Sequence, residues 1–358
     1  MRNILTMDDM DDKQILLINT NIENLEYPRA HKTSDFAVNS YLNNSERQAR
    51  LIYNKVKVRE NICYIKFKVV QIAEKIIDIL IKREFNFQSR RKLITLIPKV
   101  EHSLIHQLDK GGALEMYLLY NGGYRASPLA SGARLIFEPD QTELMLLYQV
   151  ALLQEKVQTI YPAGIKFYVV LNNGVAHWVN DTPLAATEMY AQRLRQIIDW
   201  LGASDTVGVL LQSELTGFTA RPELGKVDVP VEFSDKEKRV VERFLGRSCS
   251  LEEAKYRHGL YALAEAQWAR DLSQEIDVEN GLLLRQVAHP STMSFRSFPG
   301  GAIRTQNGSL GFQIQRGGLC PKLITSDTVQ RQNIQCVQWT KPWPVQKHDA
   351  KTNVIQNA

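Results

Sequence analysis

Residues 165–171 form a nearly unbroken run of β-branched, aromatic and aliphatic side chains, with turn residues at both ends. A short continuous apolar run of this kind is typical of a strand covered on both faces in a parallel sheet. Tyr161-Pro162-Ala163-Gly164 precedes the run, and before this turn apolar residues recur from Leu144 to Val157 at helical spacing. The segment therefore predicts a helix that begins near Pro139-Asp140, a turn and a buried strand.

Two further apolar runs, 114–120 and 207–211, predict strands of the same kind. Helical patterns at 139–157 and 187–201 separate the three runs, so the chain alternates strand and helix. This order predicts an α/β fold with a Rossmann-like, mostly parallel sheet flanked by helices. No G-x-G-x-x-G follows a predicted strand, so a dinucleotide is not indicated.

Other segments fill in this architecture. Helices are predicted at 69–80 and from near Pro98 onward, and residues 234–273, with a capping box at Ser250 and Glu253, predict a helical cover or lid. From 282 to 340, short runs separated by turn dipeptides predict an antiparallel β extension, with Asn307-Gly308 as a hairpin signal. Residues 1–55 predict a partly ordered extension, 56–345 a single domain and 346–358 a tail.

Composition narrows the classes of function. The net charge of +5 is mild and contains no block that by itself indicates nucleic acid. No apolar run reaches the roughly 18 residues of a membrane span, and the N-terminus lacks the order of a secretion signal. The cysteines are scattered and form no C-x-x-C pair, which favours reduced thiols and a cytoplasmic protein: Cys63, Cys249, Cys320 and Cys336. A homodimer is the commonest soluble assembly, but the sequence does not decide the oligomeric state.

Two groups of charged or metal-ligating residues have a simple structural interpretation beside a functional one. His102 and His106 share a helix face, yet no third ligand is near, so no metal site is expected. A basic connection follows the 69–80 helix, and a solvated surface is the simpler interpretation of it, with anion binding as the alternative. It consists of Lys82, Arg83, Arg90, Arg91 and Lys92.

Polar residues follow each predicted strand. In open α/β sheets, ligands bind outside the carboxyl ends of the strands, so these loops are the expected site. Asn121-Gly122-Gly123-Tyr124-Arg125 follows the first strand, where the glycines admit a phosphate and Arg125 can bind an anion; a plain loop is the alternative. Asn172-Asn173-Gly174, His177 and Asp181 follow the central strand, and Gln212-Ser213-Glu214 follows the third.

Several of these segments together resemble the isonitrile (isocyanide) synthases, the PvcA and dityrosine-pathway family. Pro139-Asp140, Glu143, Tyr161-Pro162-x-Gly164 and the Asn-Gly after the central strand are similar to the signature region of that family. Arg125-Ala126-Ser127-Pro128, followed by Arg134, stands where the family has a basic residue, usually Lys, and Ser-Pro. Leu284-Arg285 and His289-Pro290 match an Arg-to-His spacing in the family, and Thr340-Lys341-Pro342-Trp343 resembles its final element.

The resemblance implies an enzyme of natural-product biosynthesis that needs no redox cofactor. It would join the amine of an aromatic amino acid, Tyr or Trp, to C2 of ribulose-5-phosphate and fragment the sugar to leave an isonitrile. The substrates are thus an amino acid and a sugar phosphate. Cations must hold the phosphate, and an acid and a base must move protons at the imine.

Candidate residues follow from that chemistry. Arg125, Arg134 and Arg285 are the expected anion contacts, with Ser127 and Asn173 as further substrate-binding residues. His289 is the best candidate for proton transfer, with a structural histidine as the alternative. Glu143 would orient the amine, or simply stabilise a helix N-terminus. Asn173 replaces an Asp of the family and cannot act as a base, so Asp181 or His177 would have to substitute.

Two other interpretations remain. One is a non-catalytic α/β module that binds an anionic metabolite or a partner protein, and the other is an unrelated Rossmann-like transferase with its chemistry at Ser213-Glu214. Convergence of Arg125, His289 and Asp181 on one cleft would favour the enzyme, whereas their dispersal would favour the module.

Overall fold

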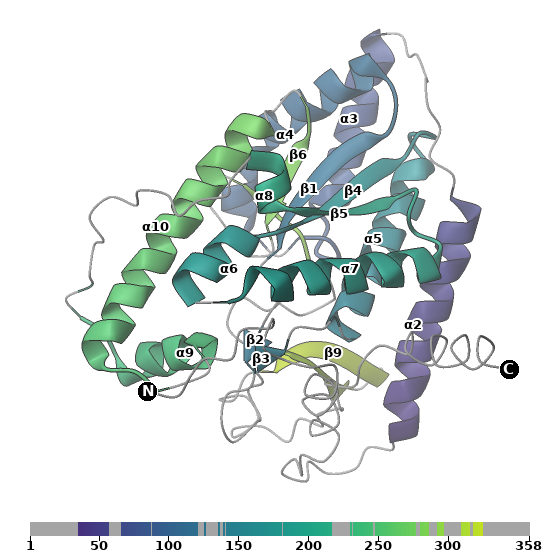
Figure 1. Ribbon diagram of the computed structural model, residues 1–358. Helices are drawn as coiled ribbons and strands as arrows, with labels where there is room; N and C mark the ends of the chain where they lie inside the picture. Colours follow the sequence, from purple (N-terminus) through teal and green to yellow (C-terminus); the bar gives the residue numbers. More distant parts are fainter. Residues whose placement is uncertain are drawn as a thin grey trace, which may run out of the picture.

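A five-stranded, all-parallel sheet forms the centre of the protein, in the strand order β5-β4-β1-β6-β7 (Figure 1). Its strands are β1 (Leu114–Tyr120), β4 (Ile165–Leu171), β5 (Val207–Leu211), β6 (Leu282–Arg285) and β7 (Met293–Ser294). The computed structural model describes residues 35–56, 66–86, 88–120, 125–126, 135–136, 139, 141–180, 182–216, 230, 232–245, 248–276, 280–285, 292–296, 309–315 and 318–324 of the 358-residue chain. The predicted Rossmann-like α/β fold and its first three strands are therefore confirmed.

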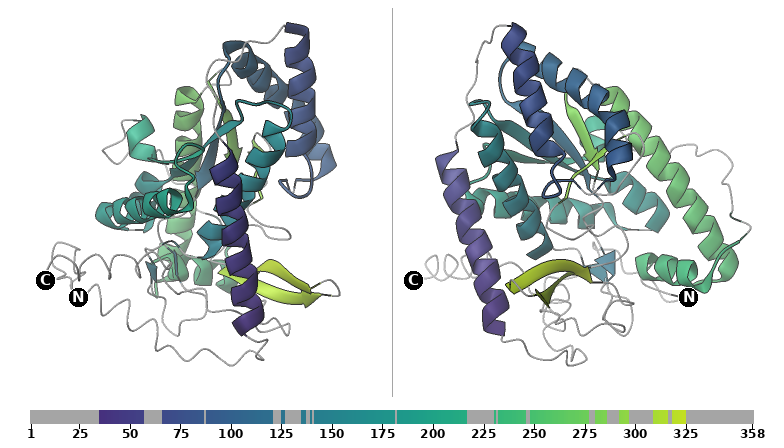
Figure 2. Two further views of the ribbon diagram at one scale, coloured as in Figure 1. Left: turned by 90° about the vertical axis from the view of Figure 1, so that its right-hand side faces the viewer. Right: turned by 180° about the vertical axis from the view of Figure 1, so that it is seen from behind.

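Helices cover both faces of the sheet. One face packs into the main core with α2 (Asp35–Lys55), α3 (Lys66–Leu80), α4 (Arg90–Lys110), α5 (Gln141–Gln158) and α7 (Leu184–Leu201). The other face contacts α6 (Asn173–Asn180), α8 (Gln212–Thr216) and α10 (Leu251–Glu275), with α9 (Asp235–Leu245) packed on α10 (Figures 1 and 2). Helices on both sides explain why the strands are nearly continuous apolar runs.

The face of the sheet that contacts α6, α8 and α10 is covered only near the carboxyl ends of its strands. In both β1 and β4 the first four residues alternate between buried and half-buried, whereas the last three are all buried. At the half-buried positions Tyr117 and Tyr168 stack, with ring centroids 4.8 Å apart. The carboxyl ends of the strands are therefore enclosed on both faces, while the amino ends are half-open on one face.

Helix ends follow local signals. Gly202 ends α7 with a left-handed φ of 71°, which glycine adopts without a Cβ clash. Ser250 caps α10, since its side chain accepts a hydrogen bond from the Glu253 N–H at 3.0 Å. Residues 234–273 are two helices, α9 and α10, rather than one helical stretch. The helix predicted to begin near Pro98 begins at Arg90, and Pro98 lies inside it.

Two segments differ from the sequence-based expectation. Asp35–Lys55, assigned to a partly ordered extension, forms α2, and Ala49, Ile52 and Tyr53 of this helix are buried against the core. Asn172-Asn173-Gly174, expected as a loop, leads directly into α6. In both cases tertiary packing stabilises a helix that polar composition had masked.

The antiparallel extension is confirmed for β8 (Ser309–Gln315) and β9 (Gly318–Ile324), which form their own two-stranded sheet. The chain connects these two strands through residues 316 and 317, and the predicted hairpin signal Asn307-Gly308 lies outside the described residues. The expectation is wrong for β6 and β7, which join the central sheet in parallel. A second short pair, β2 (Arg125–Ala126) and β3 (Leu135–Ile136), is also antiparallel.

In the part of the chain that the structure describes, every helix is too short or too polar to cross a membrane.

Candidate functional site

Polar residues converge at the carboxyl edge of the sheet because the strand ends are in register. Tyr120, Leu171 and Leu211, the last residues of β1, β4 and β5, pair in one row. On the other side of β1, Arg285 at the end of β6 pairs with Leu119. The chain leaves β1 toward β4 and returns later to β6, so the order of the strands reverses between β1 and β6. In doubly wound folds, ligands bind at such a switch point.

Glu143 is the most completely buried of the predicted site residues whose side chains the structure describes. It lies on the first turn of α5, is fully buried, and its Oε1 accepts a hydrogen bond from the Tyr190 hydroxyl at 2.6 Å. The hydroxyl of Tyr120 donates to the same oxygen. Three elements, β1, α5 and α7, thus fix one carboxyl group beside the end of β1. A buried carboxyl costs free energy unless hydrogen-bonded, and here two donors meet that need.

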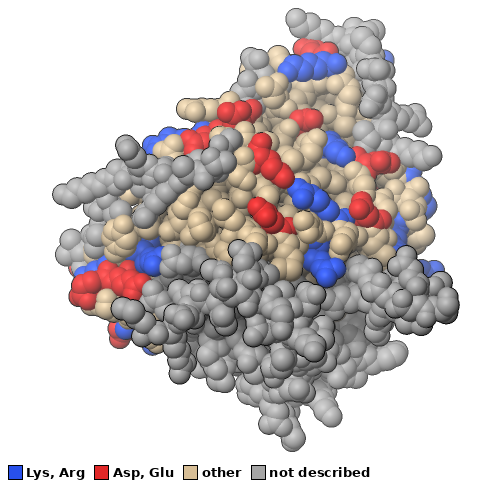
Figure 3. Space-filling model, viewed as in Figure 1, with Lys and Arg blue, Asp and Glu red and all other residues tan. Residues whose placement is uncertain are grey.

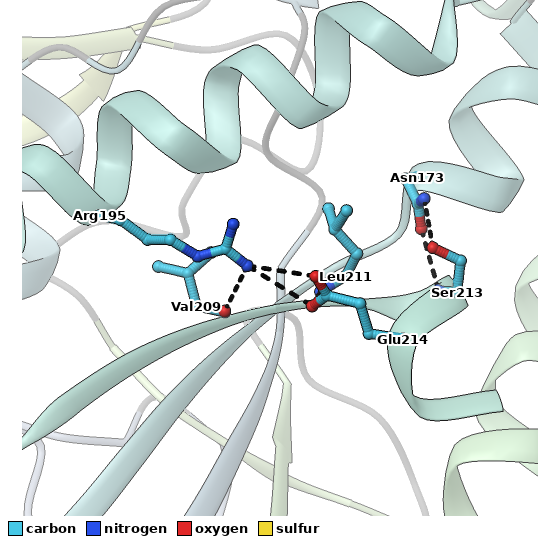
Figure 4. A network of polar contacts seen from close by, with 6 residues as sticks. All are labelled: Asn173, Arg195, Val209, Leu211, Ser213 and Glu214. Atoms are coloured by element: carbon cyan, nitrogen blue, oxygen red, sulfur yellow. Dashed lines mark hydrogen bonds and ion pairs between the residues drawn. The ribbon is translucent and has the colours of Figure 1, made fainter. Parts of the chain in front are cut away.

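Asn173 connects the ends of β4 and β5 (Figure 4). Its Nδ2 donates to Ser213 Oγ at 2.8 Å, and the backbone N–H of Ser213 donates to Asn173 Oδ1 at 3.2 Å. Both ends of the amide are engaged, so the side chain has a fixed orientation. Asn173 is therefore at the predicted edge, where it holds the backbone after β5.

Glu214 has a structural task at the same edge (Figure 4). Its Oε2 accepts from the Leu211 N–H at 2.7 Å, and Arg195 contacts Oε1 at 3.3 Å while donating to the Val209 carbonyl at 2.9 Å. These contacts close the end of β5. Ser213 Oγ accepts from Asn173 and Glu214 accepts from the backbone, so both side chains have structural contacts at this edge. A role for Ser213-Glu214 in chemistry stays a prediction.

Arg285 lies on the face of the sheet that α10 covers, where Glu265 of α10 is its neighbour. The guanidinium Nη1 lies 3.6 Å from Glu265 Oε1, and Arg285 is 5% exposed. Burial raises the pKa of the Glu265 carboxyl, and the neighbouring Arg285 guanidinium opposes that rise. The Nε of Arg285 is also buried and has no hydrogen-bond partner within the described part of the chain.

The remaining predicted residues are less well placed. His177 is on α6 and exposed, with its Nδ1 2.9 Å from the Thr182 carbonyl oxygen. Arg125 lies on β2, and its side chain falls outside the description, as do Ser127, Arg134, Asp181 and His289. The convergence of Arg125, His289 and Asp181 therefore stays a prediction.

Sequence reasoning missed three partners of the site. Tyr120 and Tyr190 were included only as parts of a predicted strand and a predicted helix, and Glu265 was assigned no role. A signal existed for the tyrosines, since a buried Tyr hydroxyl usually finds a hydrogen-bond partner. None existed for Glu265, which lies on an otherwise ordinary helix.

The fold and the edge define a doubly wound α/β protein with a candidate binding site at the switch point. No protein-family model matches the chain, and no curated protein gives a significant match. The structure is similar to the crystal structure of the PvcA protein from Pseudomonas aeruginosa, with a TM-score of 0.51 and 16% sequence identity. The match covers 71% of this chain and 94% of that one. At this identity the likeness establishes a PvcA-like fold.

Proposed function

We propose that this chain is an isonitrile synthase-like enzyme that converts the amine of an aromatic amino acid, Tyr or Trp, into an isonitrile with ribulose-5-phosphate as carbon donor. The observation that carries the proposal is the similarity of the fold to that of the PvcA protein. The match covers 94% of the PvcA chain. Glu143, Asn173 and Arg285, which stand at positions of the family's motifs, support it because they come from distant parts of the sequence to one edge of the sheet. That edge is where an α/β fold binds its ligands.

The reaction begins with attack of the amine on C2 of the ketose and loss of water to give an imine. Proton removal beside the imine then accompanies cleavage of both the C1–C2 and the C2–C3 bonds, which leaves the former C2 on the nitrogen. The reaction balances without a redox partner if C1 leaves as formaldehyde and the other three carbons leave as hydroxyacetone and inorganic phosphate. In our proposal His289 transfers protons, with Asp181 or His177 as a second group, and Arg125 and Arg134 hold the phosphate or carboxylate. Ser127 and Asn173 contribute hydrogen bonds to the substrates.

Glu143 has the best-supported role in this scheme. Its carboxyl group is fully buried and is held by Tyr120 and Tyr190 beside the end of β1. A fixed acceptor of this kind orients an amine for attack and spends little free energy on reorganisation. Arg285 would contact an anion through its Nε, since Nη1 already lies near Glu265.

One observation favours a second function, a non-catalytic module that binds an anionic metabolite. The position that carries Asp in the family carries Asn173 here, and both ends of this amide are bonded to Ser213. An amide in that arrangement cannot accept a proton from a substrate. If neither Asp181 nor His177 replaces the missing base, the site would bind its ligand without turnover.

The decisive experiment supplies the purified protein with ribulose-5-phosphate labelled with ¹³C at C2 and a pool of amino acids. A labelled isonitrile, detected by mass spectrometry and by its infrared stretch, is the expected product. Glu143→Gln should lower its rate by about 100-fold or more, as for loss of a positioned group. The matched control is Glu188→Gln on α7, because Glu188 is exposed and should leave the rate unchanged.

The negative outcomes separate the two functions. If calorimetry shows that ribulose-5-phosphate binds but no isonitrile forms, the non-catalytic module is the better description. If the sugar phosphate neither binds nor reacts, the synthase proposal is wrong.

A further inference from the structure

The turn between α3 and α4 is built onto the carboxyl edge of the sheet. Asn86 Nδ2 donates to the Ser294 carbonyl at 3.2 Å, and Gln88 Nε2 donates to the Thr292 carbonyl at 3.1 Å. The Ser294 N–H donates in return to Gln88 Oε1 at 2.8 Å. Ser294 pairs with Arg285, so the turn lies where β6 and β7 end. The right-hand view of Figure 2 shows this turn, between the two blue helices, beside the light green strands.

Cations from three segments meet around this turn. Lys82 and Arg83 follow α3, three more occupy the first turn of α4, and Arg296 follows β7, with its N–H donating to the Phe85 carbonyl at 2.8 Å. We call them the α3–α4 basic surface: Lys82, Arg83, Arg90, Arg91, Lys92 and Arg296. Burial and the nearby Arg83 guanidinium lower the pKa of Arg296, which places these two cations close together.

Among the described residues, the five cations of this surface on α4 and the turn before it have no counter-charge. The acid within the turn, Glu84, is paired with Lys156 on α5 at 2.9 Å, and Asp78 lies a turn earlier on α3. Lys82, Arg83, Arg90, Arg91 and Lys92 form no ion pair with any described residue. By contrast, basic and acidic side chains lie next to one another on the face seen in Figure 3.

The arrangement is also unfavourable for the helix itself. Cations in the first turn of a helix oppose its dipole and cost a few tenths of a kcal/mol each at an exposed site. No acidic residue offsets them there, and the Ser89 side chain makes no capping hydrogen bond. An oxyanion would relieve the repulsion and satisfy the open N–H groups together.

We propose that the α3–α4 basic surface binds the phosphate group of the sugar phosphate substrate, which leaves Arg125 and Arg134 to hold the carboxylate of the amino acid. This inference rests on the proposed function, because the phosphate is what that substrate presents. The placement fits a substrate that spans the switch point, with its phosphate at the β6–β7 side and its keto group toward Tyr120 and Glu143. Arginine side chains suit this ligand because a guanidinium can bind two phosphate oxygens at once.

The test compares two variants that lose the same charge. Arg83→Gln/Arg91→Gln removes cations from the surface, and Lys75→Gln/Lys99→Gln removes exposed cations farther along α3 and α4. Calorimetry with ribulose-5-phosphate, inorganic phosphate and unphosphorylated ribulose should show about tenfold or weaker binding of the two phosphates to the first variant. The control should bind both within about twofold of the wild type, and ribulose should not distinguish the proteins.

Unchanged phosphate binding in Arg83→Gln/Arg91→Gln would overturn the inference, as would tighter binding of a single-stranded RNA oligonucleotide than of the sugar phosphate. The proposed function is judged separately. If labelled isonitrile forms with the same KM for ribulose-5-phosphate in both variants, the function stands and this phosphate site does not. If phosphate binding falls as expected but the wild type makes no isonitrile, the site stands and the function does not.

Discussion

Asn173 and Ser213 join the carboxyl ends of β4 and β5 by two hydrogen bonds, one from the Asn173 amide to the Ser213 hydroxyl and one from the Ser213 backbone to the Asn173 carbonyl oxygen. The residues are 40 positions apart, and Asn173 is 3% exposed. This bridge fixes the spacing of two strand ends at the candidate site. Its loss should be measurable as a change in stability.

Asn173→Ala should lower the free energy of unfolding by about 1–3 kcal/mol, because it removes both hydrogen bonds and leaves buried polar groups unpaired. Asn173→Asp should cost less than about 1 kcal/mol, since a carboxylate can accept from both the hydroxyl and the N–H of Ser213. Urea unfolding of the two variants measures the difference. Equal losses of unfolding free energy in the two variants would show that the hydrogen bonds of Asn173 to Ser213 do not stabilise the fold.

The two tyrosines on Glu143 give a second prediction. Tyr120→Phe and Tyr190→Phe should each lower the free energy of unfolding by about 1–3 kcal/mol, because each removes a donor to a fully buried oxygen. The double variant should depart from the sum of the single variants, since both hydroxyls donate to the same Oε1. A double-mutant cycle in urea measures this coupling, and strict additivity would contradict a shared acceptor.

The sequence is informative about the fold for a physical reason. Strands covered on both faces must be apolar throughout, so Ile165–Leu171 is visible without any knowledge of its neighbours. The α2 helix is not, because its stability depends on packing against α5, where the Tyr53 hydroxyl donates to the Leu147 carbonyl, rather than on a strong local pattern. The short β6 and β7 resemble hairpin strands locally, and only their pairing shows that they are parallel.

The site is predictable only in part. Glu143 could be placed on the first turn of a helix and Asn173 after a strand, because both follow from local order. The contact between Glu143 and Tyr190 could not be inferred, since it joins residues 47 positions apart through tertiary packing. The Arg285–Glu265 pair likewise depends on how α10 returns across the sheet.

That buried pair predicts a pH dependence. Burial raises the pKa of Glu265 above its ordinary value of 4.5, and Arg285 partly offsets the rise. The folded protein therefore holds this proton more tightly than the unfolded chain does. The contribution of Glu265 to stability is fully present below the unfolded pKa and is lost as the pH rises through the folded pKa.

Glu265→Gln should remove this part of the pH dependence, so that stability declines less than in the wild type as the pH rises above 4.5. Arg285→Met should move the loss to higher pH, because it removes the cation that lowers the pKa. Chemical unfolding over a pH series, with Glu188→Gln as the exposed control, measures both shifts. If the plots of unfolding free energy against pH run parallel for wild type and Glu265→Gln, Glu265 does not have a raised pKa in the folded protein.

The half-open face of the sheet gives a last prediction. A Cβ added at Gly208 would lie 2.8 Å from Tyr168 Cδ1, closer than the ring can accommodate without moving. Tyr168 in turn stacks on Tyr117, so a shift of one ring disturbs the other. Gly208→Ala should therefore lower the free energy of unfolding by about 1–3 kcal/mol, the usual range for overpacking.

Tyr168→Leu should relieve that conflict, because it removes the ring atoms nearest to the added methyl group. In the Tyr168→Leu background, Gly208→Ala should cost less than about 1 kcal/mol, and the two changes should couple in a double-mutant cycle. Gly112→Ala is a useful comparison, since no atom lies within 4 Å of its added Cβ and any cost arises from its φ of 86° alone. Tyr168→Leu should not reduce that cost. If it does not rescue Gly208→Ala either, the glycine is required by the backbone rather than by the tyrosine ring.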